Sequence, residues 1–228
     1  DGVPVPMKVH ANLQFTLRGI PGVPDPPAPA VPTSTWPADF SNDIAEAGAT
    51  WKKDSLKLGD STMEFESPAG WAVRNYPQGN TMLMMLGGGG RRVAFIAAPM
   101  KTPGPMRLPI PDAMLPGMVE SLKTLMASRH LGDVRAGGQV HVGSRWWIWL
   151  NLMGTSETLN DMPPELRDVI TKLDFNELRV WSFITGTDSE MMQVMFMDWL
   201  PTPAADRDVE LRDATSQFRQ ILAKMVLK

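Results

Sequence analysis

Cysteine is absent from the 228-residue sequence, and only three histidines and one tyrosine occur in it. The missing cysteine excludes thiol nucleophiles, redox-active thiol pairs, thiolate zinc sites and disulfide scaffolds. Neither sign of charge is in large excess, because the chain has 22 Lys and Arg and 25 Asp and Glu. This balance argues against a basic nucleic-acid-binding surface. No apolar run reaches the roughly 18 residues that a membrane-spanning helix needs. We therefore expect that the chain has no transmembrane segment and does not bind nucleic acid.

The length predicts one large domain, alone or with an appendage. Proline is unevenly placed, because nine of the 21 prolines lie in the first 37 residues. Methionine has the opposite distribution, with 16 of 17 after residue 60. We therefore divide the chain into an N-terminal strand and Pro-rich arm over 1–37, a transitional segment over 38–60 and a folded domain over 61–228.

The chain begins at Asp1 without an initiator methionine or an apolar leader, which indicates a processed product. Polar and apolar residues alternate from Lys8 to Arg18, a pattern typical of a half-buried strand. Gly19–Pro37 is rich in proline and favours extended polyproline geometry. This stretch is either a tether or a proline-motif ligand. We expect that the domain folds when residues 1–37 are deleted.

Hydrophobic periodicity and turn residues predict a regular series of elements in the domain. The expected strands are Met63–Glu66, Trp71–Arg74, Thr81–Leu86, Arg92–Ala98, Asp133–Ala136, Gln139–Met153, Glu177–Thr185 and Glu190–Trp199. Gly137-Gly138 is the predicted turn between the fifth and sixth of these strands. Helices are expected over about 112–129, around 166–173 and from about 206 to the C-terminal end.

Four of the strands are apolar on both sides. Trp147 and Trp149 alternate with Ile148 and Leu150, for example. A sheet with one wet face would alternate apolar with polar residues, so both faces must be covered. The sequence predicts an α+β fold: a three-layer α/β/α sandwich with a central antiparallel sheet of about six strands covered by helices on both faces.

The order of these elements resembles the PsbP-like superfamily. The resemblance rests on Ser67-Pro68-Ala69-Gly70-Trp71 in the first strand pair, on Gly143-x-x-Trp146, and on a C-terminal helix with Phe218 and Ile221 facing inward. It covers roughly residues 60–228. Members of that superfamily include extrinsic photosystem proteins, a nuclear transport cofactor, exported lipoproteins and secretion-effector adaptors. The resemblance implies a protein that binds partners, and it implies no catalytic residues.

Catalytic groups are scarce. The histidines are His10, His130 and His141, and none stands in a pattern typical of a Ser-His-Asp hydrolase. No Gly-x-Ser-x-Gly elbow is present. We therefore predict that the chain is not an enzyme.

Two other patterns could indicate bound groups. Met191, Met195 and Met197 share one side of a strand and could bind copper(I), but thioethers also fill apolar cores, which we favour. The run Gly87–Gly90 precedes Arg91-Arg92 as in a phosphate loop. A strand follows where a phosphate loop needs a helix, so a hairpin tip is favoured. We expect neither a metal nor a cofactor.

One strand face carries polar groups beside indoles and is the candidate ligand or partner face. Its residues are His141, Arg145, Trp147, Trp149 and Asn151. Indoles next to charged and amide groups suit an anionic or amphipathic ligand. In the alternative, the two tryptophans pack beneath a helix while the polar residues lie beyond the sheet edge. Asp198 stands in an apolar strand, and a nearby arginine would offset the cost of its burial.

The sequence thus favours a non-enzymatic binding or accessory protein exported to a bacterial periplasm or cell envelope. A protein or an amphipathic molecule is the expected ligand, and a membrane tether upstream of Asp1 would fit that location. The alternative is a cytoplasmic adaptor that shields apolar helices of a partner with its Met- and Trp-rich sheet. An enzyme of unknown class is the third interpretation.

Overall fold

The computed structural model describes residues 32–40, 50–58, 61–69, 71–76, 81–86, 93–100, 107–128, 132–154, 177–186, 191–200 and 207–227. The chain divides into two units, Asp1–Val31 and Pro32–Lys228, and every described residue belongs to the second. The predicted N-terminal strand, most of the Pro-rich arm, the predicted helix around 166–173 and the Gly87–Gly90 tip lie outside the described residues. The predicted arm boundary at residue 37 falls inside the second unit.

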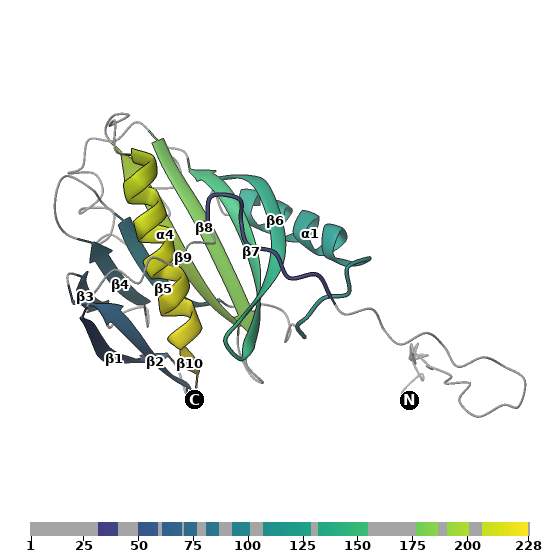
Figure 1. The fold of residues 1–228 in the computed structure, drawn as a ribbon. Coiled ribbons are helices and arrows are strands. Elements are labelled where there is room, and N and C mark those ends of the chain that lie inside the picture. Colours follow the sequence, from purple (N-terminus) through teal and green to yellow (C-terminus); the bar gives the residue numbers. More distant parts are fainter. Residues whose placement is uncertain are drawn as a thin grey trace, which may run out of the picture. The chain divides into compact units, whose positions relative to one another are not determined.

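Two antiparallel sheets and two helices make up the described fold, which confirms the predicted α+β class (Figure 1). The larger sheet has seven strands in the order β3-β4-β5-β9-β8-β7-β6, against the expected six or so. Its strands are β3 (Trp71–Tyr76), β4 (Thr81–Leu86), β5 (Val93–Met100), β6 (Asp133–Val142), β7 (Arg145–Gly154), β8 (Glu177–Gly186) and β9 (Met191–Leu200). The smaller sheet has the order β1-β2-β10, and its strands are β1 (Trp51–Leu58), β2 (Ser61–Pro68) and β10 (Val226–Leu227). The helices are α1 (Leu115–Ser128) and α4 (Arg207–Lys224).

The alternation along β7 divides the core in two. Trp147 and Trp149 belong to a cluster that contains the buried residues of α4, whereas Ile148 and Leu150 belong to a cluster with the buried residues of α1. We call these two sides of the large sheet the α4 face and the α1 face. Figure 1 shows α4 running in front of the sheet. The two apolar sides of β7 thus belong to different clusters, one with buried residues of α4 and the other with buried residues of α1.

The predicted turn at Gly137-Gly138 is wrong. Both glycines lie inside β6, and the chain reverses at Gly143-Ser144, where Gly143 has a φ of 60°. The reason is steric: a Cβ atom at Gly138 would lie 2.7 Å from Trp149 Cζ2, and one at Gly137 would lie 2.7 Å from a Val119 side-chain carbon. Because Gly137 and Gly138 have no side chains, Val119 of α1 and Trp149 can approach β6 closely. The glycines therefore serve packing inside a strand and do not mark a turn.

The transitional segment also differs from expectation, because residues 51–58 form strand β1 along the full length of β2. Its sequence is dominated by charged and polar residues, and Leu56 is the side chain that it buries most deeply. Pairing with β2, and not local hydrophobicity, therefore defines this strand. Met63–Glu66 and Trp71–Arg74 were expected to be neighbours, but β2 and β3 belong to different sheets.

Candidate functional site

The structure does not bring the five predicted site residues onto one face. In the register of β6 and β7, His141 is opposite Trp146, and Val140 is opposite Trp147. Residues directly opposite each other share a sheet face. His141 therefore points to the α1 face, and Trp147 and Trp149 point to the α4 face. The turn at Gly143-Ser144 causes this difference, because the prediction assumed one uninterrupted strand.

The two indoles are part of the core. Trp147 is 1% exposed and Trp149 is 7% exposed, and both pack with residues of α4. This is the arrangement of the alternative interpretation, in which they lie beneath a helix. Neither indole offers a face on which a ligand could stack. Trp149 Nε1 is nevertheless used, because it donates a 2.7 Å hydrogen bond to the carbonyl oxygen of Thr35.

The polar members of the predicted face also bond within the chain. Arg145 is partly buried, and its Nη1 donates to the carbonyl oxygen of Gly186 at 3.3 Å. Asn151 Nδ2 donates to Asp39 Oδ2, also at 3.3 Å. Both Thr35 and Asp39 belong to a segment that the sequence analysis divided between the arm and the transitional segment.

That segment, residues 32–40, is an ordered part of the body, and we call it the strap. Thr35 N donates to the carbonyl oxygen of Gln139 on β6, and the hydroxyl of Ser34 accepts a hydrogen bond from His141 N. These contacts place the strap along the outer edge of β6, the last strand of the large sheet. From there the strap continues onto the α4 face, where Trp36 and Phe40 lie against aromatic rings of β8.

The strap is fastened at its start by a carboxylate. Asp112, just before α1, accepts hydrogen bonds from Thr33 N at 2.9 Å and from the Thr33 hydroxyl at 2.6 Å. The Gln139 amide donates to the same carboxylate at 3.3 Å. The hydrogen bond from the Thr33 hydroxyl, followed by that from the Thr33 backbone, holds the pKa of Asp112 below its ordinary value of 3.8. Thr33, Asp112 and Gln139 thus connect the strap, the start of α1 and β6.

Phe40 occupies the centre of an aromatic cluster. It is 3% exposed, and its ring centroid lies 5.5 to 5.9 Å from those of four other aromatic residues on β8, β9 and α4. These residues are Trp181, Phe183, Phe196 and Phe218. Most of the rings meet edge-on or tilted, the geometry in which aromatic pairs are most favourable. Two aromatics four residues apart in a proline-rich stretch, Trp36 and Phe40, were the available sequence signal.

Trp36 is half-buried and lies nearer the surface than Phe40. Its ring stacks on Phe40 with a centroid separation of 5.8 Å, and the Arg219 guanidinium of α4 lies 4.5 Å from the Trp36 ring. Burial lowers the pKa of Arg219, but a guanidinium stays charged at neutral pH. A cation over an indole face is attracted by the ring quadrupole. Trp36 is therefore held between an aromatic ring and a cation.

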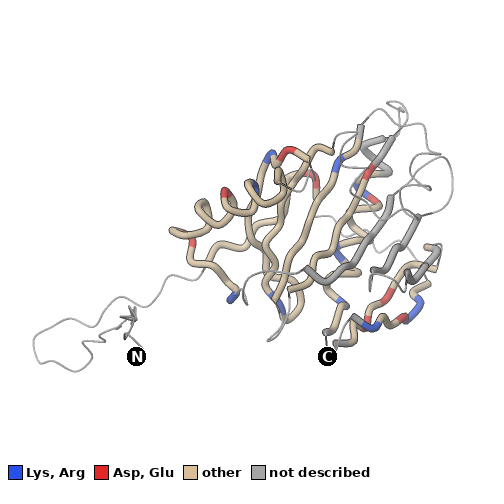
Figure 2. The backbone as a smooth tube through the Cα atoms, turned by 180° about the vertical axis from the view of Figure 1, so that it is seen from behind, with Lys and Arg blue, Asp and Glu red and all other residues tan. Residues whose placement is uncertain are grey.

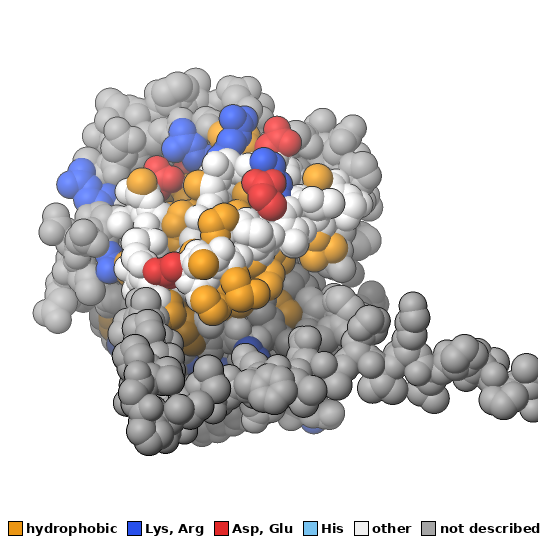
Figure 3. All heavy atoms as spheres, turned by 90° about the vertical axis from the view of Figure 1, so that its right-hand side faces the viewer, with side chains coloured by type: hydrophobic (Ala, Val, Ile, Leu, Met, Phe, Trp, Pro, Cys, Tyr) orange, Lys and Arg blue, Asp and Glu red, His pale blue; other side chains and the backbone are white. Residues whose placement is uncertain are grey.

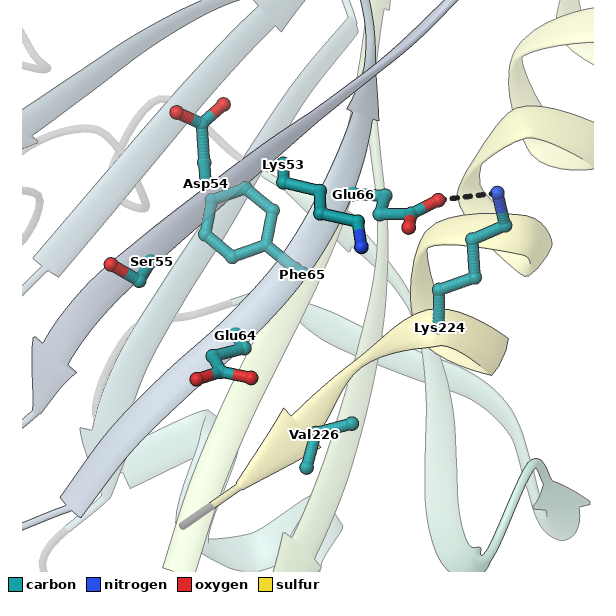
Figure 4. A pocket seen from close by; sticks show the side chains of 8 residues that line it. All are labelled: Lys53, Asp54, Ser55, Glu64, Phe65, Glu66, Lys224 and Val226. Carbon is teal, nitrogen blue, oxygen red and sulfur yellow. Dashed lines mark hydrogen bonds and ion pairs between the residues drawn. The ribbon is translucent and has the colours of Figure 1, made fainter.

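A separate depression of about 660 Å³ lies at the small sheet, where β1, β2, β10 and the end of α4 meet (Figure 4). Its lining residues are Lys53, Asp54, Ser55, Glu64, Phe65, Glu66, Lys224 and Val226. Lys224 Nζ and Glu66 Oε2 are 2.6 Å apart, and the hydrogen bond from Lys224 lowers the pKa of Glu66. Lys224 also lies 4.3 Å from the Trp51 ring. Figure 2 shows Lys and Arg interspersed with Asp and Glu in this region. Because Lys224 and Glu66 already pair with each other, we assign no ligand to this depression.

An apolar surface lies at the start of α1, and Figure 3 shows hydrophobic side chains gathered on that side of the molecule. Met114 is 63% exposed, the largest value for a large hydrophobic residue in the described part of the chain. Exposed or half-buried apolar residues surround it in the sequence. We define the α1 patch as Pro109, Pro111, Ala113, Met114, Leu115, Pro116 and Met118.

Some of the candidate metal-binding and catalytic residues lie in the described part of the chain. Among the described residues, no group of three or more His, Asp or Glu is arranged to hold a metal ion. Met191 and Met197 are buried in the cluster on the α1 face, and Met195 is partly buried against it, which agrees with core packing. Asp198 is 2% exposed and stands directly opposite Arg179 of β8. His10, His130 and the glycine run lie outside the described residues. No described helix is both long and apolar enough to cross a membrane.

Comparisons with known proteins add little. No family model and no curated protein matches the sequence. The structure is similar, at 11% sequence identity, to the Ran-binding protein Mog1p of Saccharomyces cerevisiae, with a TM-score of 0.43 over 78% of this chain and 96% of that one. It is also similar, again at 11% identity, to LpqN of Mycobacterium tuberculosis, which is involved in cell envelope biogenesis, with a TM-score of 0.42 over 79% of this chain and 93% of that one.

A crystal structure from Bacteroides thetaiotaomicron gives a TM-score of 0.38 and 11% identity over 73% of this chain. The chain spans 45% of that protein's length. Similarities of this size carry no argument about fold, partner or function. The PsbP-like resemblance therefore stays a prediction.

Proposed function

We propose that this chain is a non-enzymatic binding or accessory protein that contacts a protein partner through the α1 patch. The exposure of Met114 supports this proposal most directly. Keeping a large apolar side chain in water is unfavourable, and contiguous exposed apolar surface commonly marks an interaction site. Methionine also suits such a surface, because its flexible thioether adapts to the shape of a partner.

Charged residues lie around the α1 patch. Arg107 and Asp112 stand near its start, and Glu120 and Lys123 are exposed on the next turns of α1. Glu120 and Lys123 are 3.8 Å apart and largely solvated. An apolar centre with a mixed-charge rim is the usual composition of a protein–protein interface.

The expected location in a cell envelope belongs to the same proposal and is supported by the absence of cysteine and by the proline content of residues 1–37. The alternative, a cytoplasmic adaptor, required the Met- and Trp-rich sheet to be a binding surface. Trp147, Trp149 and Trp181 are all buried in the core. An adaptor would therefore need a different surface, and the α1 patch is one that it could use.

Site-specific photo-crosslinking of the full chain in its source cells tests the proposal. A photoreactive residue at Met114 should give a discrete crosslinked product, whereas the same residue at Lys57, exposed on the charged strand β1, should not. Ala113→Glu in the Met114-labelled chain should remove the product, because it places a charge on the exposed part of the patch next to position 114. Equal products from positions 114 and 57, or none from 114, would contradict the proposal.

A further inference from the structure

We propose that the surface beneath the strap is a peptide-binding site that the chain fills with its own residues 33–40. The occupant would be a segment of a partner protein with the chemistry of the strap, in which two aromatic residues stand four positions apart and a carboxylate directly precedes the second. It would be extended beside β6 and turn at its aromatic end, as the strap does where Phe40 N donates to the carbonyl oxygen of Pro37 at 2.9 Å. This site adjoins the α1 patch at Asp112, which fastens the strap, but its other residues lie on β6, β7, β8, β9 and α4. Its failure would leave the proposed function untouched, and failure of the proposed function would leave this site untouched.

Two of the strap's three contacts with β6 and β7 use its backbone, so another segment could make them, whereas the third needs a side-chain acceptor such as the Ser34 hydroxyl. Gln139 O, His141 N and Trp149 Nε1 all come from β6 and β7, which hold them in place. Two of the three contact the backbone of Thr35, and the third contacts the Ser34 hydroxyl. A peptide that adds to a sheet edge is bound in the same way: its backbone supplies affinity and its side chains supply specificity.

The buried indole N–H of Trp149 strengthens this interpretation. Trp149 is 7% exposed, and its Nε1 donates a hydrogen bond to the carbonyl oxygen of Thr35 in the strap. A buried donor without an acceptor is costly, and a backbone carbonyl at the position of Thr35 O removes that cost. The sheet therefore presents a donor that is matched to an occupant lying across it.

Two side-chain positions would give specificity. Phe40 fills a space lined by four aromatic rings, and Trp36 is held between Phe40 and the Arg219 guanidinium. Pro37 follows Trp36 directly and favours an extended conformation at that residue. An occupant thus needs an aromatic at each end of a five-residue span.

Asp39, the carboxylate of the strap, occupies a third position that would give specificity. Asn151 Nδ2 donates to Asp39 Oδ2, and both residues are accessible to solvent. A side chain without an acceptor oxygen, such as alanine, would lose the hydrogen bond at this position, whereas the aspartate keeps it. The carboxylate should therefore act as a selector and not as a main source of affinity.

The start of the strap, residues 33–35, is exposed and held by fewer backbone hydrogen bonds than a strand of the sheet, whereas Phe40 at its end is buried in the core. In the described part of the chain, one backbone–backbone hydrogen bond, Thr35 N to Gln139 O, joins it to the large sheet. The bonds from Thr33 to Asp112 lie at exposed positions. Segments held by few backbone bonds at accessible positions open at lower free energy than the core. A partner would still compete with a tethered strap, whose effective concentration is on the order of millimolar.

Peptide binding to the full chain provides the test. The probe is a fluorescent peptide with the sequence of residues 32–40, and the opened protein is Phe40→Ala, which removes the strap's buried anchor and leaves the site intact. We expect saturable binding to Phe40→Ala at least about ten-fold tighter than to the wild-type chain, because the wild-type strap competes. A peptide with alanine in place of both aromatics should not bind.

A double-mutant cycle tests whether the peptide binds in the geometry of the strap or only adheres to the protein through its aromatic residues. A peptide with alanine in place of the aspartate should bind Phe40→Ala about five-fold more weakly. The same change should have no effect when Asn151→Ala is added to the protein. Equal losses in both proteins, or no saturable binding by folded Phe40→Ala, would overturn the proposal.

If Phe40→Ala does not fold, Thr33→Ala serves instead, because it loosens the start of the strap without changing the aromatic cluster. This variant should incorporate the labelled peptide faster than the wild-type chain, and an unchanged rate would overturn the proposal. A wild-type dimer that Phe40→Ala abolishes would identify the occupant as the strap of a second copy. That result would overturn the assignment to a different partner.

Discussion

The side chain of Gln139 and the backbone of Ile110 exchange two hydrogen bonds. Ile110 N donates to Gln139 Oε1 at 3.0 Å, and Gln139 Nε2 donates to the carbonyl oxygen of Ile110 at 2.8 Å. Gln139 is fully buried. Because the backbone of the same residue accepts the hydrogen bond from Thr35, this one position joins the loop before α1, the edge strand and the strap.

Replacing Gln139 by Leu should therefore destabilise the protein by about 2–4 kcal/mol, since the donor and the acceptor of Ile110 both lose their partner. Urea denaturation measures the loss. Gln193→Leu is the matched control, because Gln193 is also buried and its Nε2 donates to the Ser182 hydroxyl. We expect it to cost about 1 kcal/mol. A smaller effect at 139 than at 193 would show that the Ile110 contacts contribute little.

Truncation should show that the strap belongs to the folded body. The chain divides between Val31 and Pro32, so deletion of residues 1–31 should leave the unfolding temperature unchanged within a few degrees. Deletion of residues 1–40 also removes Phe40 from its cluster and should cost several kcal/mol, in the range of large-to-small aromatic substitutions in cores. Deletion of residues 1–37 keeps Phe40, and we still expect the domain to fold without them. Circular dichroism melting of both products provides the measurement, and equal melting would contradict it.

Trp149→Ala should cost about 3–5 kcal/mol, because it empties a core position and leaves Thr35 O without its donor. His141→Ala is the control, since His141 is exposed on the other face of the sheet, and it should change stability by no more than about 0.5 kcal/mol. Chemical denaturation followed by circular dichroism distinguishes the two. A loss at 149 as small as that at 141 would restore the interpretation of a surface tryptophan.

Acid should loosen the strap through Asp112. Its folded pKa lies below the ordinary 3.8, so its contribution is fully present above that pH and is lost as the pH falls through the folded value. Amide-exchange protection at Thr35 should fall in that acid range. Asp112→Asn should have lower protection throughout and no such step. Glu66→Gln should retain the step, because Glu66 pairs with Lys224 in the small sheet; if it removed the step, Asp112 would not be the responsible group.

Much of the fold follows from alternation along the strands. Trp147 and Ile148, and Trp181 and Val180, point to opposite clusters as their parity predicts. Repeated apolar residues on both sides are a strong signal because burial on both faces needs them. The sequence of β1 has no such pattern, because few of its eight residues are buried and the strand forms by pairing with β2.

The errors at the site came from glycine. A pair of glycines inside β6 resembles a turn, and only the positions of Trp149 and Val119 show that the missing side chains make room for neighbours. Shifting the turn to Gly143 reversed the face of His141 and divided the predicted ligand surface. The strap was missed for a different reason: Trp36 and Phe40 stand among prolines, and what they contact is distant in sequence.

The position of the strap on the outermost strand bears on how copies of this chain meet one another. Strand β6 ends the large sheet, and an uncovered edge strand recruits other strands by hydrogen bonding. Ser34 and Thr35 occupy backbone groups of Gln139 and His141 that would otherwise face outward. A proteolytic cut that removed the strap would therefore expose an unpaired sheet edge, so we expect such a cut to promote self-association in addition to lowering stability.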